Sequence, residues 1–209
     1  MFTIIQAAGW PIWPLIACSV LAVALIIERF IALKTARVTP KNLLDEAISV
    51  SSVTLPGPDV IAQLAQNSAQ GEVLAAGLRT LHNAPGGSEA DLRSAMEGAG
   101  RAVAHRLEKS LMAIATIASA APLLGLLGTV IGMIEIFGSQ TSGATGVGNP
   151  AQLAHGISVA LYNTAFGLIV AIPALIFWRY FRARVDGYLL TLELSAEHFL
   201  RHLLRMQKK

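Results

Sequence analysis

Apolar side chains are concentrated in three long segments of the chain, and these segments carry no charge. Asp, Glu, Lys and Arg are missing from residues 1–27, 110–134 and 155–178. A membrane-spanning helix needs roughly 20 mostly apolar residues. The pattern therefore predicts three transmembrane helices, near residues 12–33, 111–137 and 156–180.

The polar and apolar positions outside these segments also follow a helical period. Residues 38–109 read as mostly helical, and the Ala-Pro-Gly-Gly run at 84–87 interrupts them. Ser88 is a predicted helix N-cap with Asp91 three residues on, and no helix breaker follows before Pro122. A helix from Ser88 to Phe137 would be roughly 75 Å long, about twice a membrane crossing.

The carboxyl-terminal tail continues the third predicted helix in the same way. One face of it is apolar and comprises Val185, Leu189, Leu192, Ala196, Phe199 and Leu203. A helix surrounded by water would not need this face, so we expect it to pack against another helix. The fold expected is an all-α membrane protein with three transmembrane helices, the second and third of which extend far into the cytoplasm.

The placement of Lys and Arg predicts the orientation. Of the 16 basic residues, nine lie in residues 28–110 and seven follow residue 178, while residues 1–27 and 138–155 contain none. Cytoplasmic loops carry an excess of Lys and Arg. We therefore expect the amino terminus outside and the carboxyl terminus inside. The predicted segments are a first span (1–37), a cytoplasmic segment (38–110), a second span (111–137), an outer connection (138–155), a third span (156–180) and a cytoplasmic helix (181–209).

Composition narrows the class of function. The chain is 54% hydrophobic and 14% charged, against about a quarter charged in soluble domains. The net charge of +3 follows the membrane topology, and no aromatic-rich basic patch indicates nucleic-acid binding. The single cysteine, Cys18, excludes an intrachain disulfide and a cysteine metal cluster. No sequence motif indicates an enzyme, a metal or a cofactor.

The second and third spans each carry one threonine within a face of small residues. Along the second span this face comprises Ala118, Ala121, Gly125, Thr129 and Gly132; along the third it comprises Ala160, Thr164, Gly167, Ala171 and Ala174. Such faces suit close helix packing, and they equally suit the lining of a narrow polar path. We take Thr129 and Thr164 as candidate ion-pathway residues. Candidate lining residues beside them are Val159, Ala160, Asn163, Gly125, Gly132 and Gly167.

Three other polar side chains have a simpler interpretation beside a functional one. Asn163, in the middle of the third span, is of a type that more often joins helices by hydrogen bonding than conducts ions. Glu135 and His155 fall near the outer ends of their spans. They are candidate polar groups of the outer side, although a carboxylate near the surface can also extend into the headgroups.

Taken together, these motifs resemble a known family. The run APLLGLLGTVIGM at 121–133, followed after a short connection by GISVALYNTAFGLIVAIPA at 156–174, is similar to the ExbB/TolQ family of inner-membrane proton-channel proteins. MotA of the flagellar stator is a more distant relative. The three-span topology, the large first cytoplasmic segment and the IIERF run at 26–30 extend the resemblance to most of the chain.

The resemblance implies a five-fold ring whose centre is lined by the second and third helices. The membrane helix of an ExbD- or TolR-like one-span partner would lie inside this ring, and an aspartate of that helix would carry the proton. The family's pore threonines correspond to Thr129 and Thr164. The protein would reside in the bacterial inner membrane, surrounded by lipid.

The function implied is that of an ExbB-like stator subunit. It would couple the proton motive force to transport across the outer membrane, through the partner and a TonB-like protein. Alternatives are a TolQ-like motor of envelope integrity and a membrane scaffold without ion flux. One departure bears on this choice: many members carry a pore-facing glutamate in the third span, and Val159 stands at that position.

Overall fold

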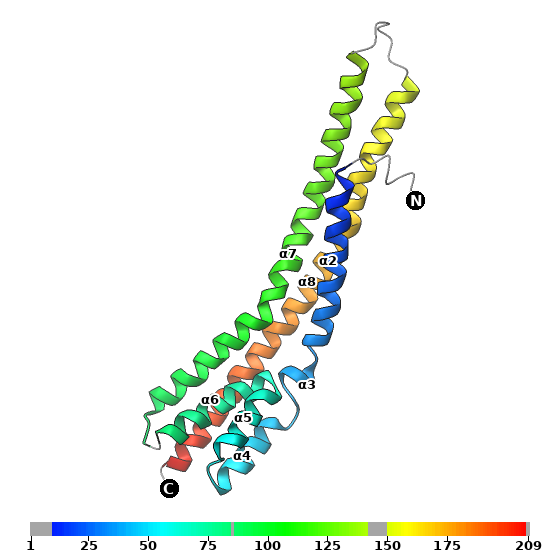
Figure 1. Cartoon of the computed structure of the whole chain (residues 1–209). Helices are drawn as coiled ribbons and strands as arrows, with labels where there is room; N and C mark the ends of the chain where they lie inside the picture. The colour runs from blue at the N-terminus through cyan, green and yellow to red at the C-terminus, as the bar shows by residue number, and fades with distance from the viewer. Residues whose placement is uncertain (1–9, 85, 142–149, 208–209) are drawn as a thin grey trace. The chain divides into compact units, whose positions relative to one another are not determined.

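The computed structural model describes residues 10–84, 86–141 and 150–207, and all regular structure in these ranges is helical. The helices, in chain order, are α2 (Ile12–Ala32), α3 (Thr35–Val38), α4 (Leu43–Val53), α5 (Pro58–Asn67), α6 (Ala69–Asn83), α7 (Glu89–Thr141) and α8 (Pro150–Gln207) (Figure 1). Two compact units divide the chain. The first comprises Met1–Glu28 and Ser110–Tyr180, and the second comprises Arg29–Lys109 and Phe181–Lys209.

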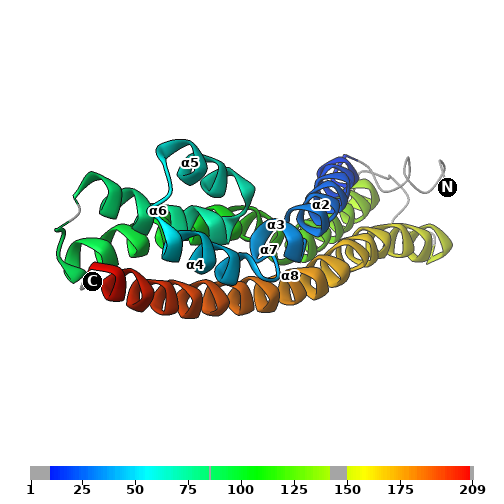
Figure 2. The same cartoon turned by 90° about the horizontal axis from the view of Figure 1, so that it is seen from below.

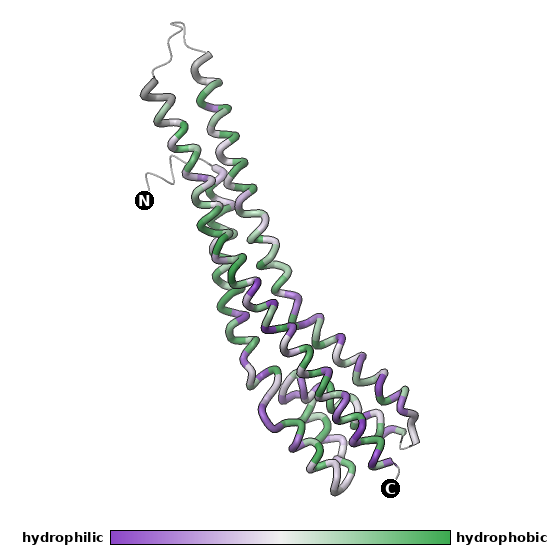
Figure 3. Tube along the Cα trace, turned by 180° about the vertical axis from the view of Figure 1, so that it is seen from behind, coloured by the Kyte–Doolittle hydropathy of each residue, from purple (hydrophilic) through white to green (hydrophobic). Residues whose placement is uncertain are grey.

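The all-helical fold and the three long apolar helices are confirmed. Helix α2, with 21 residues, and long stretches of α7 and α8 are each apolar enough to cross a membrane. Helices α7 and α8 have 53 and 58 residues and continue through Pro122 and Pro173. Proline is tolerated in a membrane helix where neighbouring groups satisfy the freed carbonyl. The apolar residues gather in the parts of both helices that belong to the first unit (Figure 3).

The two long helices extend further than the sequence pattern predicted. Helix α7 ends at Thr141 and α8 begins at Pro150, so helix occupies both ends of the expected connection at 138–155. Proline is favoured at the first position of a helix because its missing N–H would have no partner there. Residues 142–149 lie outside the described ranges.

The predicted start of α7 is confirmed in detail. The Asp91 amide donates to Ser88 Oγ at 3.2 Å, and the Ser88 amide donates to Asp91 Oδ2 at 3.0 Å. This reciprocal pair satisfies two donors that the first helical turn leaves without partners. Hydrogen bonds from the Ser88 hydroxyl and then from its amide also hold the pKa of Asp91 below its ordinary value.

In the first unit, α2 packs against the pair formed by α7 and α8. Leu15 of α2 meets Ala121 of α7 and Ala171 of α8 in one buried cluster, and Leu124, Phe166 and Val170 pack around it. Only 17% of the residues in the most apolar window of α2 are buried, and 28% in those of α7 and α8. Most of this apolar surface is therefore left for lipid or another subunit to cover.

The second unit has an ordinary helical core. Helices α4, α5 and α6 lie against the remaining parts of α7 and α8 (Figure 2). The stripe predicted in the tail is confirmed, since Val185, Leu192, Phe199 and Leu203 are all buried. A Cβ added at Gly77 of α6 would lie 2.8 Å from Met96 Sδ of α7 and 3.2 Å from Leu203 Cδ1 of α8. Gly77 therefore lets three helices meet.

The end of α2 is fixed to both long helices within this unit. Arg29 is buried and donates to the Leu107 carbonyl at 2.9 Å, while the Tyr188 hydroxyl donates to the Leu33 carbonyl at 2.8 Å. The buried guanidinium of Arg29 therefore binds the backbone of α7.

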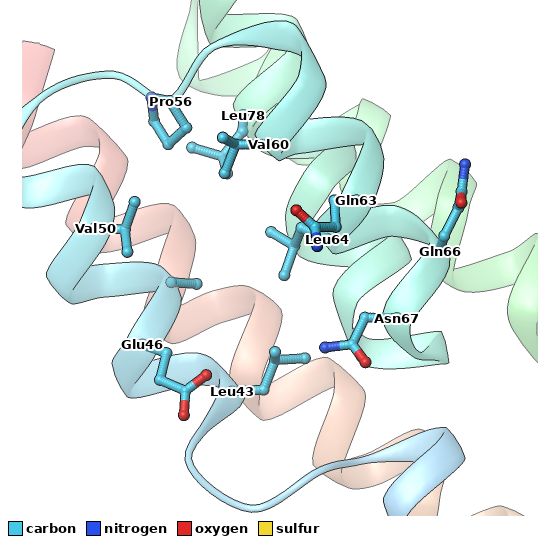
Figure 4. Close-up of a pocket in the computed structure, with 11 residues that line it drawn as sticks. Leu43, Glu46, Val50, Pro56, Val60, Gln63, Leu64, Gln66, Asn67 and Leu78 are labelled. Atoms are coloured by element: carbon cyan, nitrogen blue, oxygen red, sulfur yellow. The ribbon is translucent and has the colours of Figure 1, made fainter.

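A groove on the second unit separates α4 from α5. Leu43 and Val50 of α4 line one side, and Val60 and Leu64 of α5 line the other (Figure 4). Val50 and Val60 remain about half exposed, at 51% and 49%. The short apolar faces of the two helices are thus only partly covered within the chain.

Acid pH is expected to weaken the second unit through His202. Its Nε2 lies 3.0 Å from Ser51 Oγ, a buried hydroxyl that donates to the Ala47 carbonyl. Burial, followed by the charges of His198 and Arg205, lowers the pKa of His202 from its ordinary value of 6.5. The unfolded chain therefore binds a proton more readily than the folded one. The stability is complete above the ordinary value and decreases as the pH falls below it.

The measurement is the thermal unfolding midpoint between about pH 7.5 and about pH 5.5. A His202→Gln variant should show a smaller decrease than the parent protein, and the control variant His105→Gln, at an exposed histidine of the same unit, should not. An equal decrease in all three proteins would contradict a role for His202.

Candidate functional site

The most closely packed part of the first unit is the contact between α7 and α8. A Cβ added at Gly167 would lie 2.6 Å from the Ala121 carbonyl oxygen and 3.1 Å from Gly125 Cα. One added at Gly125 would lie 2.7 Å from the Asn163 carbonyl oxygen and 3.0 Å from Thr164 Cα. Real Cβ atoms do not approach backbone atoms so closely, so only glycine allows the two backbones to touch here.

The same contact continues toward the end of α7 at Thr141 and the start of α8 at Pro150. A Cβ at Gly132 would lie 3.0 Å from Ala160 Cβ, and one at Gly156 would lie 2.6 Å from Ile136 Cδ1. Ala160 is itself buried, with 2% of its surface exposed. The structure thus places four predicted lining residues, Gly125, Gly132, Ala160 and Gly167, between two helices of one chain.

The two threonines lie beside this contact and differ in what they bind. Thr164 Oγ1 donates to the Gly125 carbonyl of α7 at 3.3 Å, across the helix pair. Thr129 Oγ1 donates to the Leu126 carbonyl of its own helix at 2.7 Å. A hydroxyl that donates one hydrogen bond keeps its acceptor lone pairs. Both threonines can therefore still receive a hydrogen bond from a protonated group.

Both threonines lie on the flank of the helix pair that is turned away from α2. Leu124 and Phe166 pack on the cluster around Leu15 of α2, so they mark the opposite flank. At about 100° per residue, Thr129 is turned roughly 140° from Leu124, and Thr164 roughly 160° from Phe166. The two hydroxyls therefore share one side, and both residues are partly exposed there.

Other predicted residues are placed differently. Val159 is half-buried and lies seven residues before Phe166, so the two point within about 20° of each other, on the flank that faces α2. Asn163 is buried against Gly128. Glu135 is exposed on α7. The side chain of His155 lies outside the described residues, so its role as a polar group of the outer side stays a prediction.

The position of the Asn163 side chain against Gly128 does not follow from the sequence pattern. A Cβ added at Gly128 would lie 2.7 Å, 2.8 Å and 2.9 Å from Asn163 Cβ, Cγ and Nδ2. The glycine spacing in α7 pointed to close packing in general. Which side chain of α8 fills the space beside Gly128 depends on the rotation of α8 about its axis. The glycine spacing in α7 does not determine this rotation.

These features define a class of protein: a helical membrane protein with three spans, in which a tightly packed helix pair carries two intramembrane threonines. Comparison with known proteins agrees with this class. The model of the MotA/TolQ/ExbB proton channel family matches residues 65–194. A relative in Synechocystis named ExbB-like 3 is 36% identical over 180 residues, which cover 85% of this chain and 83% of the relative.

Two further relatives support the assignment. The biopolymer transport protein exbB1 of Vibrio cholerae is 34% identical over 175 residues, covering 81% of this chain and 73% of the relative. The TolQ protein of the Pseudomonas aeruginosa Tol-Pal system is 38% identical over 103 residues, 46% of this chain and 44% of the relative. The chain belongs to the MotA/TolQ/ExbB proton channel family and is a non-enzymatic transport component of the membrane.

Substitution of Gly125 by alanine is expected to destabilise the helix pair. The new methyl group would meet backbone atoms of Asn163 and Thr164, which cannot rotate away as a side chain can. Overpacking of this kind costs about 1–3 kcal/mol. The measurement is thermal unfolding in detergent. Gly138→Ala, also in α7, is the matched control because no atom lies within 4 Å of its added Cβ. Equal midpoints for the two variants would refute the close contact.

Proposed function

We propose that this chain is the ExbB-like stator subunit of a proton-driven motor in the bacterial inner membrane. It acts with an ExbD- or TolR-like partner that has one membrane helix, and it energises transport across the outer membrane through a TonB-like protein. Two relatives with ExbB names match over more than four fifths of the chain, whereas the TolQ relative matches over less than half. This difference favours the ExbB branch.

One observation carries the proposal: the hydroxyls of Thr129 and Thr164 share the flank of the helix pair that is turned away from α2. In a ring with α2 on the outside, this flank faces the centre. The closed rotational symmetry common to soluble homo-oligomers would place an equivalent pair of hydroxyls in every subunit. Within the family such a ring is five-fold, as the sequence resemblance implies.

The uncovered apolar surface of the first unit supports assembly into such a ring. The exposed side chains lie on one stripe of α7 and one of α8, and include Leu123, Val130, Ile134, Leu161, Ile169 and Ile172. A neighbouring subunit or lipid can cover these stripes. On the threonine flank the two hydroxyls lie beside exposed apolar side chains such as Val130 and Leu168, so this flank suits an apolar partner helix that carries one polar group.

The proposed topology follows the distribution of Lys and Arg. The amino terminus and the connection between α7 and α8 are periplasmic, and the second unit is cytoplasmic. The spans are those predicted from the sequence, near 12–33, 111–137 and 156–180. All 16 basic residues then lie on the cytoplasmic side.

The threonines would act on the partner's carboxyl group. An ionised carboxylate at the centre of a membrane costs about 3 kcal/mol or more, so the ionised partner helix cannot cross the apolar surface of the ring. Protonation removes this cost. Thr129 and Thr164 can accept a hydrogen bond from the protonated carboxyl group at mid-depth, while the proton passes from the periplasmic to the cytoplasmic side.

A non-conducting scaffold is the second candidate function, and Val159 is the observation that favours it. The chain has no carboxylate at the position where many relatives carry a glutamate. In the structure, however, Val159 lies on the α2 flank and the threonines lie on the other. The loss of the glutamate therefore leaves the threonine flank intact, which favours the motor over the scaffold.

The deciding experiment measures proton uptake by liposomes that contain the protein with and without its one-span partner. If the protein is a motor subunit, the liposomes take up protons only when the partner is present. If it is a scaffold, they take up protons in neither case, and if it is a self-sufficient channel, they do so in both. Thr164→Ala and Thr164→Val should greatly reduce uptake without loss of assembly, because both lack the hydroxyl. Thr164→Ser, which keeps it, should retain most of the uptake. Full uptake in the Thr164→Val protein would refute the role of this hydroxyl.

Val159→Glu tests whether the missing glutamate limits the motor. If the partner carboxyl group and the two threonines suffice, this substitution should not raise activity. It is expected to lower activity, because a carboxyl group buried among apolar side chains must be neutralised. Growth on a nutrient that requires energised outer-membrane transport is compared at equal expression, with Val159→Gln as the uncharged control. A clear gain by Val159→Glu would show that the chain is a weakened or specialised member.

A further inference from the structure

Asn163 is an amide side chain in the middle of an apolar helix, and it is almost fully buried, with 2% of its surface exposed. The side chain lies against Gly128 of α7. Three of its atoms, Cβ, Cγ and Nδ2, lie within 2.9 Å of the position that a Cβ at Gly128 would occupy. Asn163 therefore fills the space that Gly128 leaves open, as a knob fills a hole.

This seat lies next to the candidate pathway. Thr164 follows Asn163 directly, and its Cα lies 3.0 Å from the position of a Cβ at Gly125, one helical turn from Gly128. The Thr164 hydroxyl donates to the Gly125 carbonyl. A rotation of α8 that moved Asn163 out of its seat would also move this hydroxyl. The two glycines of α7 thus hold two consecutive residues of α8.

We propose that Asn163 is a positioning residue: its branched side chain, seated on Gly128, sets the rotation of α8 on α7 and thereby directs Thr164 toward the pathway. This inference rests on the proposed role of Thr164. In this role Asn163 acts by the fit of its side chain between α7 and α8, and it does not line the pathway.

The docking of helices in a membrane depends strongly on the fit of their side chains. Helices in lipid gain little from the hydrophobic effect, so van der Waals fit and interhelical polar contacts decide how they dock. A side chain without room to change its rotamer resists rotation of its helix, because packed contacts have discrete arrangements. Smooth faces of Gly and Ala alone would fit over a range of angles, and a single knob selects one of them.

The test is a double-mutant cycle in liposomes that contain the protein and its one-span partner. Asn163→Gly empties the seat, because it also removes the Cβ atom that would lie 2.7 Å from a Cβ at Gly128, and Gly128→Ala blocks the seat. Each should reduce proton uptake per assembled complex about tenfold, within the range of coupling found for residues in contact. In the double variant the methyl group of residue 128 occupies the emptied space. Its uptake should therefore exceed that of either single variant.

A fourth variant separates shape from polarity. Asn163→Leu keeps a side chain branched at the same carbon and removes the amide, so uptake should stay within about threefold of the parent protein. If Asn163→Leu is as inactive as Asn163→Gly, the amide acts by its own hydrogen bonding and the positioning role is refuted. Single-variant losses that simply multiply in the double variant would refute it as well.

The rotation itself is measured without reference to transport. Spin labels at Val130→Cys and Leu168→Cys, two exposed positions of α7 and α8, report the distance between the helices. The background is Cys18→Ser, and labelled subunits are diluted with unlabelled ones. Gly128→Ala and Asn163→Gly should shift or broaden this distance, and the double variant should restore it. An unchanged distance in both single variants refutes the positioning role, even where uptake falls.

This readout also separates failure of the inference from failure of the proposed function. If Thr164→Val conducts normally while the spin-label distances follow the cycle, the seat is real and the pathway assignment is wrong. In that case Asn163 would not position a functional hydroxyl, and the inference falls with its premise. If Thr164→Val is inactive and the distances do not respond, only the positioning role is refuted.

Discussion

The direct contact between the backbones of α7 and α8 is the constraint on which the functional part of the molecule depends. At Gly125 and Gly167 the backbones of the two helices approach so closely that a methyl group on either glycine would overlap backbone atoms of the other helix. In a membrane, where lipid is as apolar as the side chains, close approach of this kind is a main source of helix association. It also brings the Thr164 hydroxyl within reach of a carbonyl on the other helix.

This contact resolves the two interpretations of the small-residue faces. Helix packing and pathway lining do not exclude each other, because the face of small residues is wider than the contact between α7 and α8. Gly125, Ala160 and Gly167 lie inside it and hold the helices together. Thr129 and Thr164 lie at its edge, on the side away from α2, and are available to another molecule. A glycine-rich stripe with a threonine at its margin can therefore serve both purposes.

The sequence was sufficient for features that depend on one helix at a time. The three apolar helices, the Ser88 cap of α7 and the buried stripe of the tail all follow from periodicity or local hydrogen bonding. It was insufficient where the relative rotation of two helices decides the outcome. The burial of Arg29 on the Leu107 carbonyl and the seat of Asn163 on Gly128 are of this kind. Periodicity shows which residues share a face, but it does not show which neighbour that face meets.

The position of Val159 shows why this distinction matters for function. Along α8 it lies five residues before Thr164, and from the sequence alone both could be taken to face one pathway. The five-residue spacing separates their directions by about 140°, and the packing of Phe166 on the Leu15 cluster shows that Val159 is the one on the α2 flank. A carboxylate there and a hydroxyl at position 164 would act in different surroundings, so one can be replaced by valine without removing the other.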